Sequence, residues 1–580
     1  MNSNPALARR VLRLIFSFLA CAFCAAFPLA AQTAGNASIS GRVQNSASGS
    51  ALENARITVA GTNREAFTDA FGEFRLTGLG GGEVTLTVFY TGLTPASAAV
   101  KVAAGATARR DFSLVPVAAG RTTAAADGVV KLDQFIVDSA RDTSAASIAT
   151  NEQRFSPSIK TVLSTDALGD VIQNNLGEFV KFLPGVDVGT DQMNSVQIGL
   201  RGLPSNYTNI ALDGDDVNAA GSAGPTRNTL LQAFSLSNAQ RVEIYKVPTP
   251  DMPASLAGGI NMVSRTAFEA SRPELRFKAY MNQNSREFNV RRQSGGGDGD
   301  DQRQTYHYQP DFDFAYTVPL SKTFGFSINA TKNDQFGSAR RVNRTFNTTT
   351  TAANPFKATV DNPYLTTFQY NVFPVYEHRY AIGTRLDWKV SAVDTLSFSY
   401  SGNWLVQDYE QHNFILNAGT NPLSWGSDFT HGRAGSGAVN VNNTARYVRV
   451  RNNVFRLNYR HIGALWDFTG AAGYNFSDQT YRANSHRQFE APGGRIQSAQ
   501  IDFDGFDDYL PGKVTVRNAA GQVIDPFNVN SYNFFINGAS TTRDNDSTAK
   551  NARLDAKRKF YSDQANFSVK IGGSTNESYR

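Results

Sequence analysis

The stretch "RGLPSNYTNIALDGDDVN", residues 201–218, places three carboxylates in four positions, at Asp213, Asp215 and Asp216. Carboxylates so spaced could ligate calcium or act as a pair of acid and base groups. A calcium loop of the EF-hand type starting at Asp213 would need Asp or Asn at position 217, Gly at 218 and Glu at 224, where the chain has Val, Asn and Gly. No His lies in the stretch, so acid–base chemistry has little support. We interpret these carboxylates as part of a scaffold.

The rest of the chain gives no catalytic constellation. Neither an H-E-x-x-H nor a G-x-S-x-G motif is present, and the histidines are scattered. They are His307, His378, His412, His431, His461 and His486. The acidic glycine stretch "GGGDGDD", residues 295–301, could hold calcium, but a solvated loop is the stronger interpretation. We therefore predict a protein that is not an enzyme and that has no metal site and no cofactor.

Composition points to β-structure. The charged fraction of the 580 residues is 18%, below the usual value of about 25%, while Gly, Phe and Tyr are abundant. The net charge is +6, but the basic residues are scattered along the chain, so no nucleic-acid partner is predicted.

The first residues read as an export signal. Arg9, Arg10 and Arg13 precede an apolar run and then small residues, which predicts cleavage between Ala31 and Gln32 and a signal peptide over residues 1–31. A membrane anchor and a lipid-anchored cysteine are weaker alternatives. Both cysteines of the chain lie inside this segment, so the mature protein would have neither a disulfide nor a cysteine-ligated zinc.

Residues 38–116 predict a small β-sandwich, because short alternating runs such as "ARITVAG" and "EVTLTVFYTGL" are separated by Gly, Asn and Asp. The runs "GRV", "ALENARITVAGT", "TDAFGEFRL" and "GLGGGEVTLTVFYTGL" resemble the carboxypeptidase regulatory-like domain. That resemblance implies no peptidase activity.

Residues 117–141 predict a linker that ends in "VVKLDQFIVDSAR". Val130, Leu132, Phe135 and Val137 give this segment an extended, partly alternating pattern. The segment is either the first strand of the next domain or a peptide that a partner binds by strand addition.

Residues 142–268 predict a compact α+β domain. Apolar residues at helical spacing occur from Leu168 to Val180, before a stop at Pro184 and Gly185. Extended runs follow, including "SVQIGLRGL", "NIALDGDDV", "AQRVEIYKV" and "AGGINMVSR". In this context the Asp213-Gly214 pair predicts a tight turn that positions the neighbouring carboxylates.

Residues 269–580 predict a transmembrane antiparallel β-barrel. Period-two alternation recurs in about eight runs, among them "LRFKAYMN", "YAIGTRLDWKV" and "VFRLNYR". Connections of about five residues alternate with long ones that are rich in Asn, Gly and Asp, as in outer-membrane barrels. A soluble sandwich would alternate in polarity but would not give this asymmetry of loop lengths.

The order of these segments resembles that of a TonB-dependent outer-membrane receptor. Three runs resemble the signature stretches of its plug domain: "GEFVKFLPGVDV", "VQIGLRGLPSNYTNIALDGDDVN" and "QRVEIYKVPTPDMPASLAGGINMVSR". Val247 departs from the pattern, because relatives commonly have Gly there. By this resemblance Val130, Leu132, Phe135 and Val137 form a candidate TonB box. The candidate plug scaffold comprises Arg201, Gly202, Asp213, Gly214, Gly258, Gly259 and Asn261, with Arg201 paired to Asp213; Asp215 and Asp216 would face either the ligand path or water.

The resemblance implies a barrel of 22 strands that encloses the plug and imports a scarce ligand, such as a glycan, a siderophore or a cobalamin-like molecule. Its implied partners are TonB with the inner-membrane energising complex, the outer-membrane lipid, the barrel assembly machinery and a small-molecule or oligosaccharide ligand. We expect the protein in the cell outer membrane with its N-terminal domain in the periplasm, and the sequence to be the N-terminal part of a longer receptor. Alternatives are a signal-transducing receptor and a non-transporting structural or adhesive barrel.

Overall fold

The computed structural model describes most of the chain outside its N-terminal segment and a number of connections. The described residues are 37–117, 140–156, 158–165, 175–191, 194–217, 231, 234–236, 239–249, 256–285, 293–294, 304–305, 308–349, 358–483, 490–506, 510–561 and 566–579. Within these ranges, every helix is too short or too polar to cross a membrane.

The N-terminal domain is a sandwich of two sheets. One contains β4 (Glu73–Leu79), β1 (Ala37–Asn45), β7 (Thr107–Arg109) and β8 (Phe112–Leu114), and the other contains β3 (Glu65–Phe67), β2 (Arg56–Val59), β5 (Gly82–Phe89) and β6 (Ala96–Val102). Alternate side chains of the strands fill the space between the sheets, where Ile39, Ile57 and Leu86 are completely buried. Helix α2 (Ala140–Arg154) adds Ile148 to the same core.

A second domain follows, built on a mixed five-stranded sheet. Its strand order is β13 (Asp215–Asp216), β12 (Thr208–Leu212), β15 (Gly258–Ser264), β14 (Ala239–Tyr245) and β9 (Lys160–Ser164). The hairpin of β10 (Val186–Asp191) and β11 (Asn194–Leu200) packs beside it with helix α3 (Leu176–Val180), which Asn175 caps by accepting a hydrogen bond from the backbone of Gly177.

The third part is a large antiparallel sheet. The nine strands of its main path are β16 (Glu274–Gln283), β19 (Tyr308–Pro319), β20 (Phe324–Asn347), β21 (Tyr364–Lys389), β22 (Asp394–Asn417), β25 (Gly437–Ile462), β26 (Trp466–Arg482), β30 (Thr542–Tyr561) and β31 (Asn566–Tyr579). Five further strands extend it: β23 (Pro422–Trp425), β24 (Phe429–Gly432), β27 (Gly493–Phe506), β28 (Pro511–Arg517) and β29 (Phe534–Ile536). The pair β17 (Gln293–Ser294) and β18 (Gln304–Thr305) lies in the connection from β16 to β19.

The prediction of about eight barrel strands missed one, because β30 carries few apolar residues. The sequence of this strand, "TRDNDSTAKNARLDAKRKFY", is mostly charged or polar, and its alternating face is marked only by small or single apolar residues near its end. With β30 included, the main-path strands are joined alternately by short and by long connections, as the sequence predicted.

The two faces of the large sheet differ in polarity. The outward side chains of the main-path strands form an exposed apolar band that includes Phe277, Leu386, Trp388, Phe398, Leu457, Phe468, Leu554 and Ile571. On β21 this band extends from Tyr380 to Trp388, about 27 Å at roughly 3.4 Å per residue, close to the height of the lipid-facing band of outer-membrane barrels. The opposite face carries buried polar residues such as Asn371, Glu377 and Asn452.

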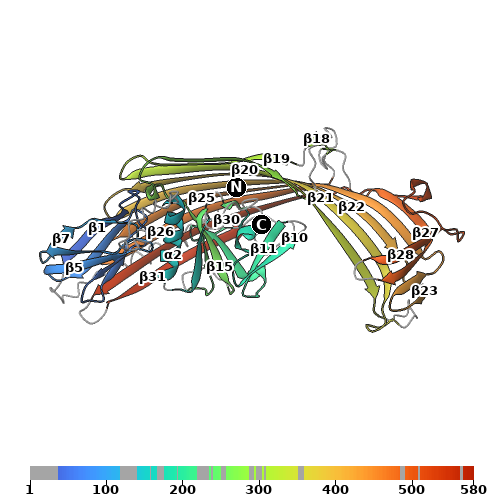
Figure 1. Cartoon of the computed structure of the whole chain (residues 1–580), viewed down its shortest axis with the longest axis horizontal. Coiled ribbons are helices and arrows are strands. Elements are labelled where there is room, and N and C mark those ends of the chain that lie inside the picture. The colour runs from blue at the N-terminus through green and yellow to red at the C-terminus, as the bar shows by residue number, and fades with distance from the viewer. Residues whose placement is uncertain are drawn as a thin grey trace, which may run out of the picture.

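In Figure 1 the large sheet arches over the second domain, which lies on its concave side. The N-terminal domain lies at one end of the arch, and β23, β27 and β28 lie at the opposite end. Contacts at the first end are made by the short turns, since Thr77 donates a hydrogen bond of 2.9 Å to the carbonyl of Ala464 and Lys389 forms an ion pair with Glu73. The predicted fold class, mainly β with a large antiparallel sheet, an α+β domain and an N-terminal β domain, is confirmed.

Candidate functional site

The "DGDD" stretch forms a tight hairpin at the edge of the five-stranded sheet. Asp213 and Gly214 both have positive φ, 50° and 88°, and connect the antiparallel strands β12 and β13. Two consecutive residues of this kind form the turn that suits a two-residue hairpin loop. The hairpin lies against the polar face of the large sheet, so its carboxylates meet side chains from several long strands.

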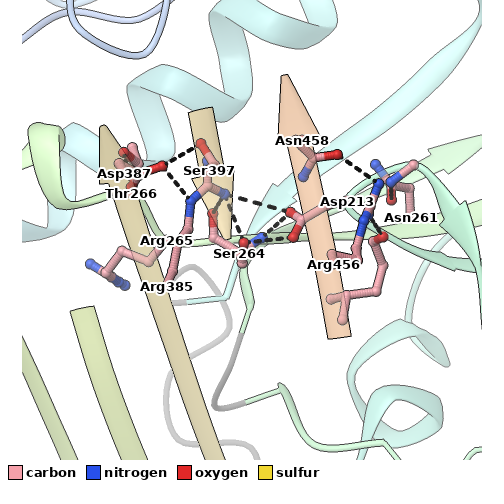
Figure 2. A network of polar contacts seen from close by, with 12 residues as sticks. Asp213, Asn261, Ser264, Arg265, Thr266, Arg385, Asp387, Ser397, Arg456 and Asn458 are labelled. Atoms are coloured by element: carbon pink, nitrogen blue, oxygen red, sulfur yellow. Dashed lines mark hydrogen bonds and ion pairs between the residues drawn. The ribbon is translucent and has the colours of Figure 1, made fainter. Parts of the chain in front are cut away.

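Asp213 links the hairpin to strand β15 and to the sheet (Figure 2). Its two carboxylate oxygens accept hydrogen bonds from the backbone amide and the hydroxyl of Ser264, each of 2.7 Å. Arg385 of β21 approaches Asp213 to 3.8 Å and donates to the Ser264 hydroxyl at 2.8 Å. Ser264 is thus bound by both partners and bridges them.

Asp387, two residues further along β21, extends the same network of hydrogen bonds (Figure 2). It accepts a hydrogen bond of 2.9 Å from Arg385 and one of 2.7 Å from Ser397 of the sheet. On the side of the five-stranded domain it accepts from the Thr266 hydroxyl at 2.9 Å and from the backbone amide of Ala267 at 3.2 Å. The buried carboxylate of Asp387 therefore joins the end of β15 to the polar face of the large sheet, called the wall below.

Arg456 of β25 makes the most deeply buried charged contact between the two parts. Its guanidinium lies 2.7 Å from the Asp215 carboxylate, and the side chains are 2% and 9% exposed. It also donates to the carbonyl of Leu212 and, at 3.2 Å, to Asn458 (Figure 2). A buried charge is costly unless it is both paired and hydrogen-bonded, and Arg456 is both.

Asp216 differs because its hydrogen-bond partners are neutral. Its carboxylate accepts hydrogen bonds from Asn209 at 2.5 Å and from Asn576 of β31 at 3.2 Å, and its backbone carbonyl accepts one from Asn551 of β30 at 3.2 Å. Burial raises the pKa of the Asp216 carboxyl, and the two asparagines offset only part of that rise. Of the two possibilities left open for Asp216, ligand path or water, the structure favours neither, since the side chain is bonded to Asn209 of its own domain and to Asn576 of the large sheet.

Apolar side chains also pack across the same boundary. Leu405, Val450 and Val454 of the large sheet join the buried cluster that forms the core of the five-stranded domain. Hydrogen bonds and ion pairs cross the boundary at Asp213, Asp215 and Asp387. The domain is therefore held against the large sheet by apolar packing and by polar contacts together.

Of the other predicted scaffold residues, Asn261 contacts the turn of this hairpin, whereas Gly258 and Gly259 pair with the opposite end of β12. Asn261 accepts a hydrogen bond of 2.7 Å from the Gly214 amide, which fixes the turn. Arg201, at the positive-φ position before Gly202, donates instead to the carbonyl of Leu256 at 3.3 Å. The predicted pair of Arg201 with Asp213 is wrong, because Arg385 of the sheet is the arginine that lies beside Asp213.

Gly258 and Gly259 begin β15 beside β14, and Gly258 can be replaced only at high cost. It has φ of 112°, and a Cβ atom would lie 2.1 Å from the carbonyl oxygen of Tyr245. We expect Gly258→Ala to destabilise the five-stranded domain by about 3 kcal/mol, since the cost of the left-handed backbone conformation and the cost of the clash with the carbonyl add together. Hydrogen exchange of the β14 and β15 amides measures this.

Gly185→Ala is the matched control for that substitution. Its φ of 80° is also left-handed, but a methyl group added there would have no other atom within 4 Å. We expect a cost of about 1 kcal/mol from the backbone conformation alone. Equal exchange in the two variants would show that the clash at Gly258 is relieved by a small shift.

A second buried cluster joins the five-stranded domain to the N-terminal part. Glu243 of β14 accepts hydrogen bonds from Tyr245 at 2.7 Å and from Asn261 at 3.2 Å, and it lies 3.2 Å from Arg241 and 3.7 Å from Lys160. Burial opposes ionisation of Glu243, but the two cations and the two hydrogen bonds outweigh it and hold its pKa below the ordinary range.

Lys160 and Arg241 also form ion pairs with residues of the elements that precede the five-stranded domain. Lys160 forms a second ion pair with Glu152 of α2, and Glu152 also accepts a hydrogen bond from Asn54 of the N-terminal sandwich. Arg241 lies 3.4 Å from Glu53. Sandwich, helix and five-stranded domain therefore share one set of buried charges.

Several sequence predictions fall on residues outside those the structure describes. These are the candidate TonB box at Val130, Leu132, Phe135 and Val137, the cleavage point at Ala31 and Gln32, and the acidic loop at residues 295–301. Among the described residues, no group of three or more His, Cys, Asp or Glu side chains is placed to hold a metal ion.

Sequence reasoning missed the cations of the site. Arg385 and Arg456 occupy polar positions in strands whose other face is apolar. Arg385 precedes Leu386, and Arg456 lies between Phe455 and Leu457. That alternation could have placed both arginines on the inner face. It could not have shown which of the inner arginines meets the hairpin, because the strand register is not readable from one sequence.

Comparison with known families gives two matches. Residues 38–115 match the carboxypeptidase regulatory-like domain. Residues 152–260 match the TonB-dependent receptor plug domain, which includes the hairpin and most of the five-stranded sheet. Among curated proteins, none matches the sequence.

Solved structures give weak similarities. The unliganded ferric citrate transporter FecA has 11% identity over 74% of this chain and 58% of its own, with a TM-score of 0.33. A mutant ferric enterobactin receptor (PfeA) from Pseudomonas aeruginosa, in complex with enterobactin, has 11% identity over 70% and 63%, with a TM-score of 0.28. A type II cohesin–X-dockerin complex from Acetivibrio cellulolyticus has 18% identity over 14% and 55%, with a TM-score of 0.12.

The chain spans less than two thirds of the length of each of these solved chains. The two domain matches lie in this order along the sequence, ahead of a large antiparallel sheet. This is the order that the sequence predicted. The chain therefore contains a carboxypeptidase regulatory-like domain followed by a TonB-dependent receptor plug domain.

Proposed function

We propose that this protein takes up a scarce ligand across the outer membrane, with the five-stranded plug domain as the gate. The ligand is a glycan, a siderophore or a cobalamin-like molecule. The plug closes the path by binding to the polar face of the sheet and opens it when TonB, energised from the inner membrane, pulls on the segment that precedes the plug.

The observation that carries the proposal is the charged contact between the hairpin and the wall. Arg456 meets Asp215 at 2.7 Å and Arg385 meets Asp213 at 3.8 Å, with the acid on the plug and the cation on the sheet in both pairs. Burial raises the pKa of the Asp215 carboxyl, and the nearby cations Arg456 and Arg553 offset only part of that rise. Contacts of this kind hold the plug against the sheet in the closed state, and water can replace them when the plug separates.

The exposed apolar band supports placement in the outer membrane. Side chains such as Trp388 and Ile571 are 49% and 65% exposed, which lipid would cover. We further propose that the N-terminal domain lies in the periplasm, because it contacts the short turns of the sheet at Lys389 and Ala464. Short turns face the periplasm in barrels of this kind. Barrel assembly machinery would then insert the strands.

The test is uptake after removal of the candidate TonB box. Cells producing the receptor without residues 129–137 are given radiolabelled glycans, ferric siderophores and cobalamin. We expect the ligand that wild type imports to remain bound at the cell surface and to be imported at less than about a tenth of the wild-type rate.

The control is a deletion of equal length, residues 118–126, in the preceding part of the linker. It shortens the tether without touching Val130, Leu132, Phe135 or Val137, so import should persist. Equal import by the two deletion variants would contradict the role of TonB, and binding without any import in wild type would favour the non-transporting barrel.

A further inference from the structure

A cavity of about 830 Å³ lies at the end of the sheet opposite the N-terminal domain, between the long strands and the extension formed by β27 and β28. Figure 1 shows this extension at the far end of the arch. Small-molecule sites commonly have volumes of about 300 to 1,000 Å³. The cavity therefore has room for a ligand of drug size.

The floor of the cavity belongs to the outer face of the sheet. Phe368 is paired with Leu416, and Tyr370 is paired with Phe414, across β21 and β22. Phe368 and Tyr370 are an even number of residues from Trp388 of the exposed band, so they share its face, while the plug lies on the other face. The cavity is outside the path that the plug closes.

The cavity also lies beyond the apolar band. Tyr370 is separated from Tyr380, the end of the band on β21, by about 34 Å of strand at roughly 3.4 Å per residue. Bilayer lipid therefore does not account for its apolar lining.

The loop at residues 525–532 lies at the open side of the cavity, and hydrogen bonds within the loop fix its conformation. The Asp525 carboxylate accepts from the amide of Phe527 at 2.9 Å, and its carbonyl accepts from the Ser531 hydroxyl at 2.8 Å. The Tyr532 hydroxyl donates to the carbonyl of Pro526 at 2.8 Å. Phe527 is thereby placed over Phe414 with the rings stacked, 5.1 Å between centroids and 16° between planes.

Phe527 is nevertheless 80% exposed. An apolar ring held in this way, with one side free, provides a preformed surface for another ring.

Charge in the lining is confined to one residue. Of the residues that line the cavity, all within the described ranges, Asp525 is the only one that is charged at neutral pH. A carboxylate at the rim repels an anion and attracts a cation. The walls offer aromatic faces and aliphatic groups such as Val514 and Leu416, and few hydrogen-bonding groups.

We propose that this cavity binds a ring-containing apolar molecule that is neutral or carries one positive charge. The ring packs against the stacked pair of Phe527 and Phe414, next to Tyr370, and a positive group, where present, lies beside Asp525. Anionic ligands are excluded by the same carboxylate. The site is separate from the plug, so its occupation does not depend on whether the protein transports.

The test uses three probes that share one ring system and differ in charge: 1-naphthylmethylammonium, 1-naphthylmethanol and 1-naphthylacetate. Binding to the protein in lipid nanodiscs is measured by saturation-transfer NMR, with empty nanodiscs subtracted. We expect the cation to bind at least fivefold more tightly than the anion. Asp525→Asn should remove that ratio while leaving the neutral probe unchanged.

Phe527→Ala should weaken all three probes about tenfold. Phe535→Ala is the matched control, because Phe535 is an exposed aromatic residue of the same extension, 67% exposed, outside the lining, and should leave binding as in wild type. An anion that binds as tightly as the cation, a Phe527→Ala variant that binds like wild type, or no saturable binding would each overturn the proposal. The last result would mean that another protein surface covers the cavity.

Discussion

Replacing Arg456 by Gln is expected to release the plug hairpin from the wall. The substitution leaves Asp215 buried with its closest cation gone, and an unpaired buried charge costs about 3 to 5 kcal/mol. A loss of about 4 kcal/mol raises the population of the open form roughly a thousandfold. Hydrogen exchange of the Val217 and Asp213 amides, which donate to Ile210 and Met262, measures this opening.

Arg449→Gln is the matched control, since Arg449 lies on the same strand with its side chain 38% exposed and 3.9 Å from Asp478. A long pair with an exposed arginine contributes about 1 kcal/mol or less, and Asp478 keeps its closer partner Arg451 at 2.8 Å. Adding Asp215→Asn to Arg456→Gln should recover part of the protection, because both charges are then absent. Exchange that is equal in the Arg456 and Arg449 variants would mean that the ion pair does not hold the hairpin.

Replacing Lys160 by Met is expected to destabilise the junction between the plug and the elements before it. The Lys160 side chain is 4% exposed and is paired with both Glu152 and Glu243. Met keeps the apolar stem and removes the charge, which should cost about 2 to 3 kcal/mol, because Arg241 still balances part of the negative charge. Exchange of the β9 and β14 amides reports the loss. Lys181→Met, at an exposed ion pair with Glu178, is the control and should have little effect.

The same variant should change how the stability of the plug depends on pH. In the wild type the pKa of Glu243 is lowered, so its stabilisation is complete above the unfolded-state pKa of about 4.3 and is lost only as pH falls through the lower folded-state value. Without Lys160, burial of Glu243 has less opposition and its pKa rises. The free-energy difference between wild type and variant should therefore be larger at pH 7 than at pH 5. A difference that is the same at both pH values would contradict this account.

Much of the fold could be predicted because it depends on local patterns. The period-two alternation marked most of the long strands, and the Asp213-Gly214 pair marked the turn where the chain has positive φ. The strand β30 was missed because its apolar face is built largely from small residues beside charged ones, and lipid-facing strands give a weak signal in any single segment.

The partners of the hairpin could not be predicted, because they depend on strand register over long distances in sequence. Arg385 and Arg456 are more than 150 residues from the carboxylates that they meet. A shift of one residue in either strand would turn the guanidinium to the outer face. The sequence therefore indicated that the carboxylates were structural but assigned Asp213 to the wrong arginine.

The position of β9 has a mechanical consequence. It is the edge strand of the plug sheet and is paired only with β14, while it is the first strand after α2. A tension applied ahead of α2 thus reaches a strand whose hydrogen bonds to a single neighbour can break in succession, and the other four strands remain paired during this step. The force at which the plug first yields would accordingly be set by the hydrogen bonds between β9 and β14 and by the ion pairs of Lys160. A force–extension trace should therefore show a small early step before any larger one.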